Sequence, residues 1–238
     1  MNSKMNLNKQ KRARIVEVVG PAGAGKTTLC TALSRHSNIQ VDNFPDVRKA
    51  VNVPFFTLYG LQVLSTMAFT QPASLTELER REFAWLSILR GWPGVLRREL
   101  KKHENLILLD QGPVYLFSEM SLFGPGFLKS EKTRRVWRMW YRRWADTLDA
   151  IVWLDAPDDN LVQRIRSRQK DHVVKDKSDQ TIFNFLTDYR QVYEQTLSTL
   201  KTNHAGLRVL RFDTNQQTPE EIAEQLFVAF DLKAYSPK

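Results

Sequence analysis

Cysteine is almost absent from this sequence. Cys30 is the single cysteine among 238 residues, so the chain cannot form an intrachain disulfide. The four histidines are scattered, and no cluster of cysteine and histidine has the spacing of a zinc site. Cys30 falls on an expected helix, and we interpret it as a small core residue rather than a reactive thiol.

The sequence also has few features that direct a protein to a membrane. We find no run of 18 apolar residues and therefore expect no transmembrane helix. Residues 1–13 are polar and basic without an apolar stretch, so we expect a flexible tail rather than a secretory signal. The simplest interpretation is a cytoplasmic protein.

Negative charge is in short supply. The 35 Lys and Arg residues outnumber the 26 Asp and Glu residues, giving a net charge of +9. Such a surplus favours anionic partners, which include nucleotides, nucleic acid and acidic membrane surfaces. It does not choose among them.

Five short segments are apolar or rich in β-branched residues and are expected to form strands. They cover residues 15–19, 39–44, 105–110, 150–155 and 207–213. Helical patterns cover 26–35, 55–70, 75–102, 130–148, 158–169, 180–202 and 219–231. This alternation predicts an α/β fold of three layers, with a five-stranded parallel sheet flanked by helices.

We expect residues 14–238 to form one domain, because no repeat, low-complexity block or linker interrupts them. Residues 45–104 are a mostly helical insertion between the second and third strands. Such an insertion would lie over the carboxyl ends of the strands, where open α/β sheets bind ligands.

The loop after the first strand carries the most specific motif. It matches G-x-x-x-x-G-K-[ST] through Gly20, Pro21, Ala22, Gly23, Ala24, Gly25, Lys26 and Thr27. Glycines let backbone N–H groups wrap phosphates, and the helix N-terminus adds partial positive charge. Lys26 would reach the β- and γ-phosphates, and Thr27 would ligate Mg²⁺. We expect this loop, with Thr28, to bind a nucleoside triphosphate.

Missing motifs narrow the class of P-loop protein. The Asn-Lys-x-Asp motif of common GTPases and the Leu-Ser-Gly-Gly signature of ABC-type ATPases are both absent. An AAA-type machine would need a longer chain.

Two further strands end in aspartate. In "LILLDQG", Asp110 has the position of a carboxylate that holds Mg²⁺ or its water, although it could merely cap a turn. Asp155 is followed by a helix that ends in basic residues, namely Arg164, Arg166, Arg168 and Lys170. These cations either complement the helix dipole or belong to a mobile lid that closes on phosphate.

The order of these segments resembles the thymidylate kinase and deoxynucleoside kinase group of P-loop kinases. The resemblance covers about residues 14–231, although only the P-loop and the lid segment match closely. It implies ATP and Mg²⁺ as cofactors, a helical acceptor side formed by 45–104, and a lid at about 164–178. Lys26 and Thr27 carry over as phosphate and Mg²⁺ residues, and Arg164 and Arg168 are the best-matched lid arginines. The loop 213–218 lies where these kinases hold adenine.

Gln111 departs from that group, in which an arginine follows the acidic residue of this strand. Glutamine adds no charge, so a phosphate-bearing acceptor is in question. Either Arg48, Arg80 or Arg81 substitutes, or the acceptor is a nucleoside, a sugar or another alcohol.

Transfer to an alcohol is helped by a carboxylate that takes the hydroxyl proton. Asp42 and Asp46 end the second strand, where deoxynucleoside kinases carry an acidic residue near the acceptor hydroxyl. Asp42 could instead face solvent or cap a turn before Pro45.

The segment "TRRVWRMWYRRWADTL" combines aromatic and basic residues. Its apolar members share one helical stripe, namely Trp137, Trp140, Tyr141, Trp144 and Leu148, and arginines take the other faces. One interpretation is a buried stripe with a solvated basic face. The other is a helix that contacts an anionic membrane or nucleic acid.

Two functions remain open from the sequence. The first is an ATP- and Mg²⁺-dependent kinase that phosphorylates a small molecule, with nucleosides and nucleoside monophosphates as the leading acceptors. The catalytic candidates are Lys26, Asp42, Asp110, Arg164 and Arg168, with His172 beside the lid. The alternative is a nucleotide-dependent switch that docks through its basic helix. The sequence leaves open whether the chain forms a homodimer.

Overall fold

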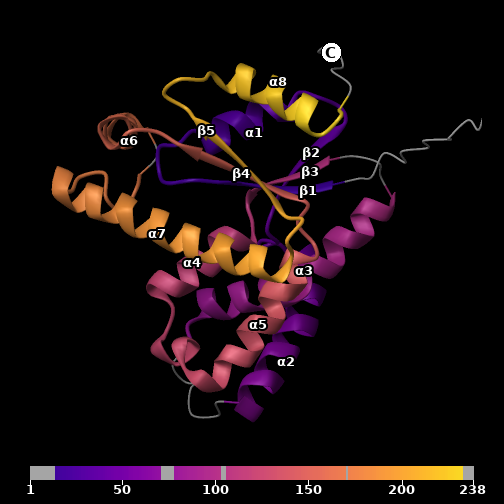
Figure 1. The fold of residues 1–238 in the computed structure, drawn as a ribbon. Helices are drawn as coiled ribbons and strands as arrows, with labels where there is room; N and C mark the ends of the chain where they lie inside the picture. Colours follow the sequence, from indigo (N-terminus) through magenta and orange to yellow (C-terminus); the bar gives the residue numbers. More distant parts are fainter. Residues whose placement is uncertain (1–13, 71–77, 103–105, 170, 233–238) are drawn as a thin grey trace, which may run out of the picture.

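A computed structural model describes residues 14–70, 78–102, 106–169 and 171–232. The expected basic tail, residues 1–13, lies outside the described residues. Five parallel strands form one sheet in the order β2-β3-β1-β4-β5 (Figure 1). The strands are β1 (Arg14–Val19), β2 (Ile39–Asn43), β3 (Leu106–Gln111), β4 (Ala150–Asp155) and β5 (Arg208–Asp213). The predicted α/β class with a five-stranded parallel sheet is confirmed.

Helices cover both faces of the sheet. The α-helices are α1 (Lys26–Ser34), α2 (Val53–Thr70), α3 (Arg80–Lys102), α4 (Pro113–Phe123), α5 (Glu131–Ala145), α6 (Asp158–Ser167), α7 (Asp179–Asn203) and α8 (Pro219–Ala229), with short 3-10 turns η1 (Ala50–Asn52) and η3 (Gly126–Lys129). Helices α1 and α8 lie on one face, and α3, α4, α5 and α7 lie on the other (Figure 1). Alternate residues of β1 therefore belong to two cores: Val16 and Val18 face α1 and α8, whereas Ile15 and Val19 face the larger helical layer.

Helix α4 was not predicted from the sequence. Its stretch PVYLFSEMSLF is buried from Pro113 to Met120 except at Tyr115, so it lacks the polar face that gives an amphipathic period. Pro113 begins the helix, because proline tolerates the first helical position. The pattern of a helix buried on nearly all sides cannot be told from that of a buried strand.

Glu17 lies on β1 beneath the start of α4 and is fully buried. Its carboxylate accepts hydrogen bonds from the backbone N–H groups of Gly112, Val114 and Tyr115, at 2.9–3.1 Å. These are N–H groups that the first turn of a helix leaves without intrahelical partners. Burial raises the pKa of Glu17 to about 8, and the three backbone donors oppose that shift.

Glu17 is expected to make the protein less stable as pH rises. Its pKa is raised in the folded state, so the folded chain keeps a proton that the unfolded chain releases above its ordinary value of 4.5. The free energy of unfolding should fall by about 1.4 kcal/mol per pH unit between these two pKa values. Denaturant unfolding from pH 5 to 8 would measure the slope. Glu17→Gln should flatten it, whereas exposed Glu194→Gln should not; equal slopes in all three proteins would contradict the assignment.

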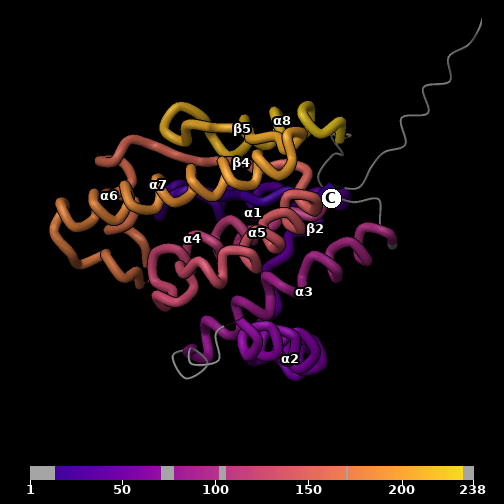
Figure 2. Tube along the Cα trace, turned by 60° about the horizontal axis from the view of Figure 1, so that its bottom comes forward, coloured from indigo at the N-terminus to yellow at the C-terminus, as the bar shows by residue number. Residues whose placement is uncertain are grey.

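The inserted helices α2 and α3 pack together closely and project away from the sheet (Figure 2). A Cβ at Gly60 of α2 would lie 2.8 Å from Phe83, and a Cβ at Gly91 of α3 would lie 2.3 Å from the Tyr59 ring. Two large aromatic rings thus fill the space left by two missing side chains. The inner face of α2 is fixed against α3 by this fit.

One helix among the described residues has the length and composition of a membrane span. Residues 50–70 have a mean hydropathy of 1.2 and no charged residue, and only 17% of the most apolar window is buried. The sequence analysis passed over this segment because uncharged polar residues interrupt its apolar run, although they leave its mean hydropathy high. By itself, one such helix is weak evidence for a membrane span.

The aromatic stripe of α5 packs into the core. Trp140, Trp144 and Leu148 are buried, and Trp137 and Tyr141 are partly buried against the same cluster. The indole N–H of Trp144 donates to the Leu89 carbonyl oxygen of α3 at 3.0 Å. The interpretation of a buried stripe with a solvated basic face is confirmed.

Candidate nucleotide site

The P-loop joins β1 to α1 at the carboxyl edge of the sheet. Gly23 and Gly25 have φ angles of 83° and 84°, a conformation that residues with a side chain rarely adopt. Gly25 lies directly before the first residue of α1, Lys26. The loop therefore ends at a helix N-terminus, where partial positive charge favours phosphate.

The Lys26 ammonium lies within its own loop. It donates hydrogen bonds to the carbonyl oxygens of Gly20 and Pro21, at 2.8 and 2.9 Å. Burial lowers its pKa to about 8, and the Asp110 carboxylate acts in the opposite direction. In this structure the two carbonyl oxygens are the hydrogen-bond partners of the ammonium group. A bound nucleotide phosphate would be a stronger partner, because it carries a full negative charge.

Thr27 and Asp110 lie together at the mouth of the loop. The Thr27 hydroxyl donates to Asp110 Oδ2 at 3.3 Å, which joins the start of α1 to the end of β3. No cluster of three or more acidic, histidine or cysteine ligands occurs in the part of the chain that the structure describes. Mg²⁺ in nucleotide sites takes only one or two protein oxygens and fills its shell with phosphate and water. The oxygen pair of Thr27 and Asp110 fits that requirement.

Arg168 directly follows α6 and approaches the P-loop. Its charge acts on Lys26, and the charges of Arg168 and Lys26 both act on His172. Burial first, and these two cations next, lower the pKa of His172. The structure therefore brings Lys26, Arg168 and His172 within electrostatic range of one another.

Arg164 has a different environment, although it lies only four residues before Arg168, on α6. Its guanidinium donates to the Thr214 hydroxyl at 2.8 Å, to the Thr214 carbonyl oxygen at 3.0 Å and to the Gly23 carbonyl oxygen at 3.4 Å. It thus connects the P-loop to the loop 213–218. Arg166 is exposed and pairs with Asp179. Lys170 lies outside the described residues.

Asp42 lies near the end of β2, beside the carboxyl end of β3, and Asp46 lies in the turn that follows. Asp42 is on β2 opposite Leu109, and its pKa is raised by burial and, less strongly, by the nearby Glu99. Its Oδ1 accepts the N–H of Asn43. Asp46 accepts the N–H of Arg48 and so closes a turn.

The sequence analysis missed a polar group between α3, α4 and α7. Glu119 is buried and receives a hydrogen bond from the Tyr189 hydroxyl. Arg81 lies over the Trp85 ring at 4.8 Å, and its charge acts on Glu119 and Tyr115. Tyr189 stacks obliquely on Phe185, which meets His172 edge-on, so this group continues toward the P-loop. These residues lie on three helices that are far apart in the sequence, so no helical or strand periodicity could have related them.

The sequence analysis placed Asp155 at the end of a strand, now β4, but did not predict its partner. Arg190 of α7 donates to both of its carboxylate oxygens at 2.9 Å and also pairs with Asp158. This bidentate pair fixes the start of α6. Arg164 lies farther along that helix, and Arg168 directly follows it. Arginine and aspartate stand 35 positions apart, so helical spacing could not relate them.

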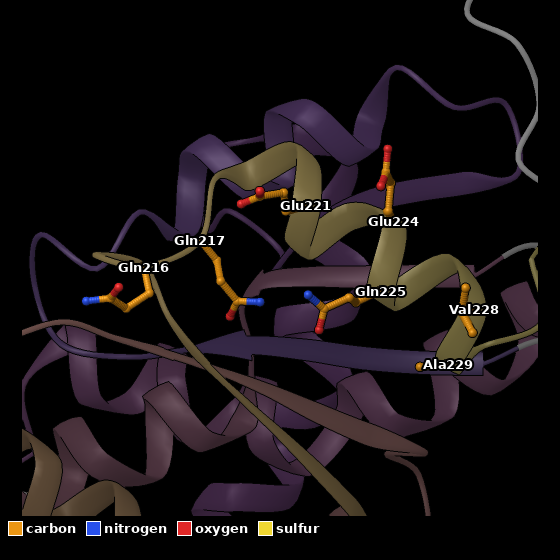
Figure 3. A pocket seen from close by; sticks show the side chains of 7 residues that line it. All are labelled: Gln216, Gln217, Glu221, Glu224, Gln225, Val228 and Ala229. Carbon is orange, nitrogen blue, oxygen red and sulfur yellow. The ribbon is translucent and has the colours of Figure 1, made fainter.

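A separate hollow of ≈ 660 Å³ lies against α8 (Figure 3). It is lined by Gln216, Gln217, Glu221, Glu224, Gln225, Val228 and Ala229. Two carboxylates and no cation make this lining unsuited to phosphate. No P-loop residue lines the hollow, although Gln216 and Gln217 belong to the loop 213–218.

Comparison with known proteins places this geometry in a family. Residues 16–184 match the family model described as an AAA domain. No curated protein matches the sequence. The sequence analysis set AAA-type machines aside because of the chain length, but chain length did not predict that this domain matches an AAA-domain model.

Solved structures share the fold at low sequence identity. The YorR protein from Bacillus subtilis, in complex with phosphorylated GDP, is 15% identical with a TM-score of 0.52, covering 94% of this chain and 99% of its own. Deoxyadenosine kinase from M. mycoides, with the products dCMP and dCDP bound, is 14% identical with a TM-score of 0.50, covering 91% and 98%. The chain thus belongs to the AAA-domain family of P-loop NTPases and has the fold of the deoxynucleoside kinase-like group.

Proposed function

We propose that this protein is an ATP- and Mg²⁺-dependent kinase that transfers the γ-phosphoryl group to a small acceptor, with nucleosides and nucleoside monophosphates as the leading class. One observation carries the proposal: Lys26, the Thr27–Asp110 pair and Arg168 converge at the carboxyl edge of the sheet. Phosphoryl transfer depends mainly on positioning and on charge stabilisation, which these groups can supply.

Each of these residues has a separate task in the proposal. The P-loop glycines and Lys26 bind the phosphates, and Arg168 stabilises charge on the transferred group. Thr27 and Asp110 would hold Mg²⁺, which screens phosphate charge when bound. Arg164 braces the P-loop against the loop 213–218, beside the adenine. A cytoplasmic location fits this activity and stays an expectation.

The acceptor is proposed to lie between the P-loop and the group around Glu119. Aromatic rings of Phe185 and Tyr189 line the way from His172 to Glu119, and stacked rings suit a nucleobase. Arg81 is the best-placed substitute for the arginine that Gln111 replaces, because its charge reaches this group. The two structural neighbours carry nucleotides in their descriptions, which agrees with this acceptor class.

ADP release from ATP·Mg²⁺ across a panel of nucleosides, nucleoside monophosphates and sugars would test the proposal. A strong increase with one compound class, together with the phosphorylated acceptor in the product mixture, is the expected result. Release that no compound alters would contradict it and would favour a nucleotide-dependent switch. Gln111 is the residue that supports this alternative, whereas the aromatic side chains of its docking helix are used in the core.

Arg168 and Arg164 should affect different kinetic constants. Arg168→Ala is expected to lower kcat by about 10²-fold with little change in the KM for ATP, because it removes charge near the transferred phosphoryl group. Arg164→Ala should mainly raise the KM for ATP, because it releases the brace between Gly23 and Thr214. Steady-state kinetics of both variants, with Arg166→Ala as the control, would measure the split. Equal effects of all three would refute these roles.

A further inference from the structure

Pro93 lies inside α3 and changes the hydrogen bonds of that helix. Proline has no N–H group, so the carbonyl oxygen of Leu89, four residues earlier, loses its helical partner. The indole N–H of Trp144 on α5 donates to this oxygen at 3.0 Å. The neighbouring Arg143 guanidinium donates to the next carbonyl oxygen of α3, that of Arg90, also at 3.0 Å. A partly buried arginine of α5 is thereby held against the middle of α3.

Gly94, the residue after this proline, carries no side chain at the place where Arg143 approaches α3. A Cβ at this position would lie 3.4 Å from Nη2 of Arg143 and 3.8 Å from the hydroxyl oxygen of Tyr59. Arg143 belongs to α5 and Tyr59 to α2, and Gly94 is partly exposed. Hydrogen-bond donors from two other helices therefore meet at a point of α3 that has no side chain of its own.

Two further arginines share this side of α3. Arg90 lies four residues before Gly94 and Arg97 three residues after it, and these spacings place side chains on one helical face. Burial first, and the charges of Arg90 and Arg97 next, lower the pKa of Arg143. Among the described residues, no carboxylate forms an ion pair with any of these three arginines. Three positive charges are thus held within electrostatic range of one another without an acidic partner.

The helix dipoles do not account for this arrangement. Cations stabilise a helix when they lie in its last turn. Arg90 lies about three turns before the end of α3 at Lys102, too far for such an effect. Arg143 is in the last turn of α5, but its guanidinium bonds to a carbonyl oxygen of α3 rather than to those of its own helix. A negatively charged ligand is the partner that would offset the repulsion among the three arginines.

We propose that Arg90, Arg97 and Arg143, together with the Tyr59 hydroxyl, bind a phosphate group of a ligand. Guanidinium groups donate paired hydrogen bonds to phosphate oxygens and stay charged, and a phenol hydroxyl donates one more. The phosphate belongs either to a soluble polyphosphate or to a lipid headgroup. The four residues come from α2, α3 and α5, whereas the P-loop joins β1 to α1 (Figure 1). This second anion site is independent of the proposed kinase activity.

Isothermal titration calorimetry with inorganic pyrophosphate tests the site. The P-loop also accepts phosphate, so the full-length Lys26→Ala chain is the parent, and ionic strength is kept constant. This parent should still bind pyrophosphate. Adding Arg97→Ala should weaken binding at least about tenfold, the usual cost of one hydrogen bond to a charged group. A parent that binds no pyrophosphate would overturn the site.

Arg35→Ala is the matched control for Arg97→Ala. Arg35 is also exposed, and it follows α1 on the other face of the sheet. Its removal from the same parent takes away one positive charge and should change pyrophosphate binding by less than about twofold, because a distant surface charge is screened by salt. Equal effects of Arg97→Ala and Arg35→Ala would overturn the site.

Gly94→Asp supplies the missing negative charge from the protein itself. Its Cβ would lie at ordinary contact distance from Arg143, so the new carboxylate can reach the guanidinium. The same parent with Gly94→Asp should lose pyrophosphate binding. Its thermal midpoint without ligand should exceed that of Gly94→Asn, which has the same shape without the charge. Binding as tight as in the parent, by a folded Gly94→Asp chain, would overturn the site.

Vesicles identify the source of the phosphate. The parent and its Arg97→Ala variant are sedimented with vesicles of phosphatidylcholine, with and without phosphatidic acid, whose headgroup is a phosphate. Sedimentation that needs both phosphatidic acid and Arg97 assigns the site to a lipid headgroup. A protein that stays in the supernatant and binds pyrophosphate assigns it to a soluble polyphosphate. A protein that binds neither would overturn the site.

Discussion

Lys26→Ala is expected to lower acceptor-dependent ADP formation by at least about 10²–10³-fold, the usual cost of removing one preorganised donor from a transition state. The amine lies within the P-loop and bonds two of its carbonyl groups, so it is positioned for the phosphates before nucleotide binds. Both kcat and kcat/KM should fall, because the charge acts on groups that become more negative during transfer.

The matched control for Lys26→Ala is Lys132→Ala on the exposed side of α5. This variant removes the same charge from the protein without touching the loop and should retain wild-type rates. Circular dichroism and the thermal midpoint would show that Lys26→Ala stays folded. Full activity in a folded Lys26→Ala protein would remove the P-loop from the mechanism.

Trp144→Ala is expected to lower the free energy of unfolding by about 3–5 kcal/mol, as for other buried tryptophans. Trp144 is fully buried, meets Trp92 edge-on at 5.9 Å between ring centroids, and donates to Leu89. The substitution would leave a large cavity between α3 and α5 and an unpaired carbonyl group. Such a loss is a large part of the stability of a typical domain.

Arg138→Ala, on the exposed face of α5, should change the unfolding free energy by less than about 0.5 kcal/mol. Urea unfolding of the two variants would therefore separate the two faces of one helix. A small effect of Trp144→Ala would mean that the aromatic stripe is available for partners, and would revive the docking interpretation of this helix.

Local pattern was enough to predict most of the fold. The strands of the sheet were found because their apolar runs alternate with helical periods, and the P-loop because its motif lies between a strand and a helix. Helix α4 escaped, because a helix buried on nearly every side shows no period. The apolar outer face of α2 was not predicted either. Its apolar residues are interspersed with uncharged polar ones, and this pattern resembles that of an ordinary core helix.

The candidate site was only partly accessible from the sequence. The motif predicted positions for Lys26 and Thr27, and a strand end suggested Asp110; the structure adds the contact between the last two. Arg164 and Arg168 looked equivalent at four-residue spacing, yet one contacts Thr214 and the other approaches Lys26. The direction of such a side chain depends on the loops around it, and the spacing of residues in the sequence does not give the positions of those loops.

The interlocked packing of α2 and α3 has a mechanical consequence. Gly60 receives Phe83 and Gly91 receives Tyr59, so each helix carries a ring that fits into the other. This fit opposes sliding and rolling of one helix against the other. It joins the uncharged outer face of α2 to the start of α3, which carries Arg81. A displacement of the outer face of α2 is therefore expected to shift Arg81, whose charge acts on Glu119.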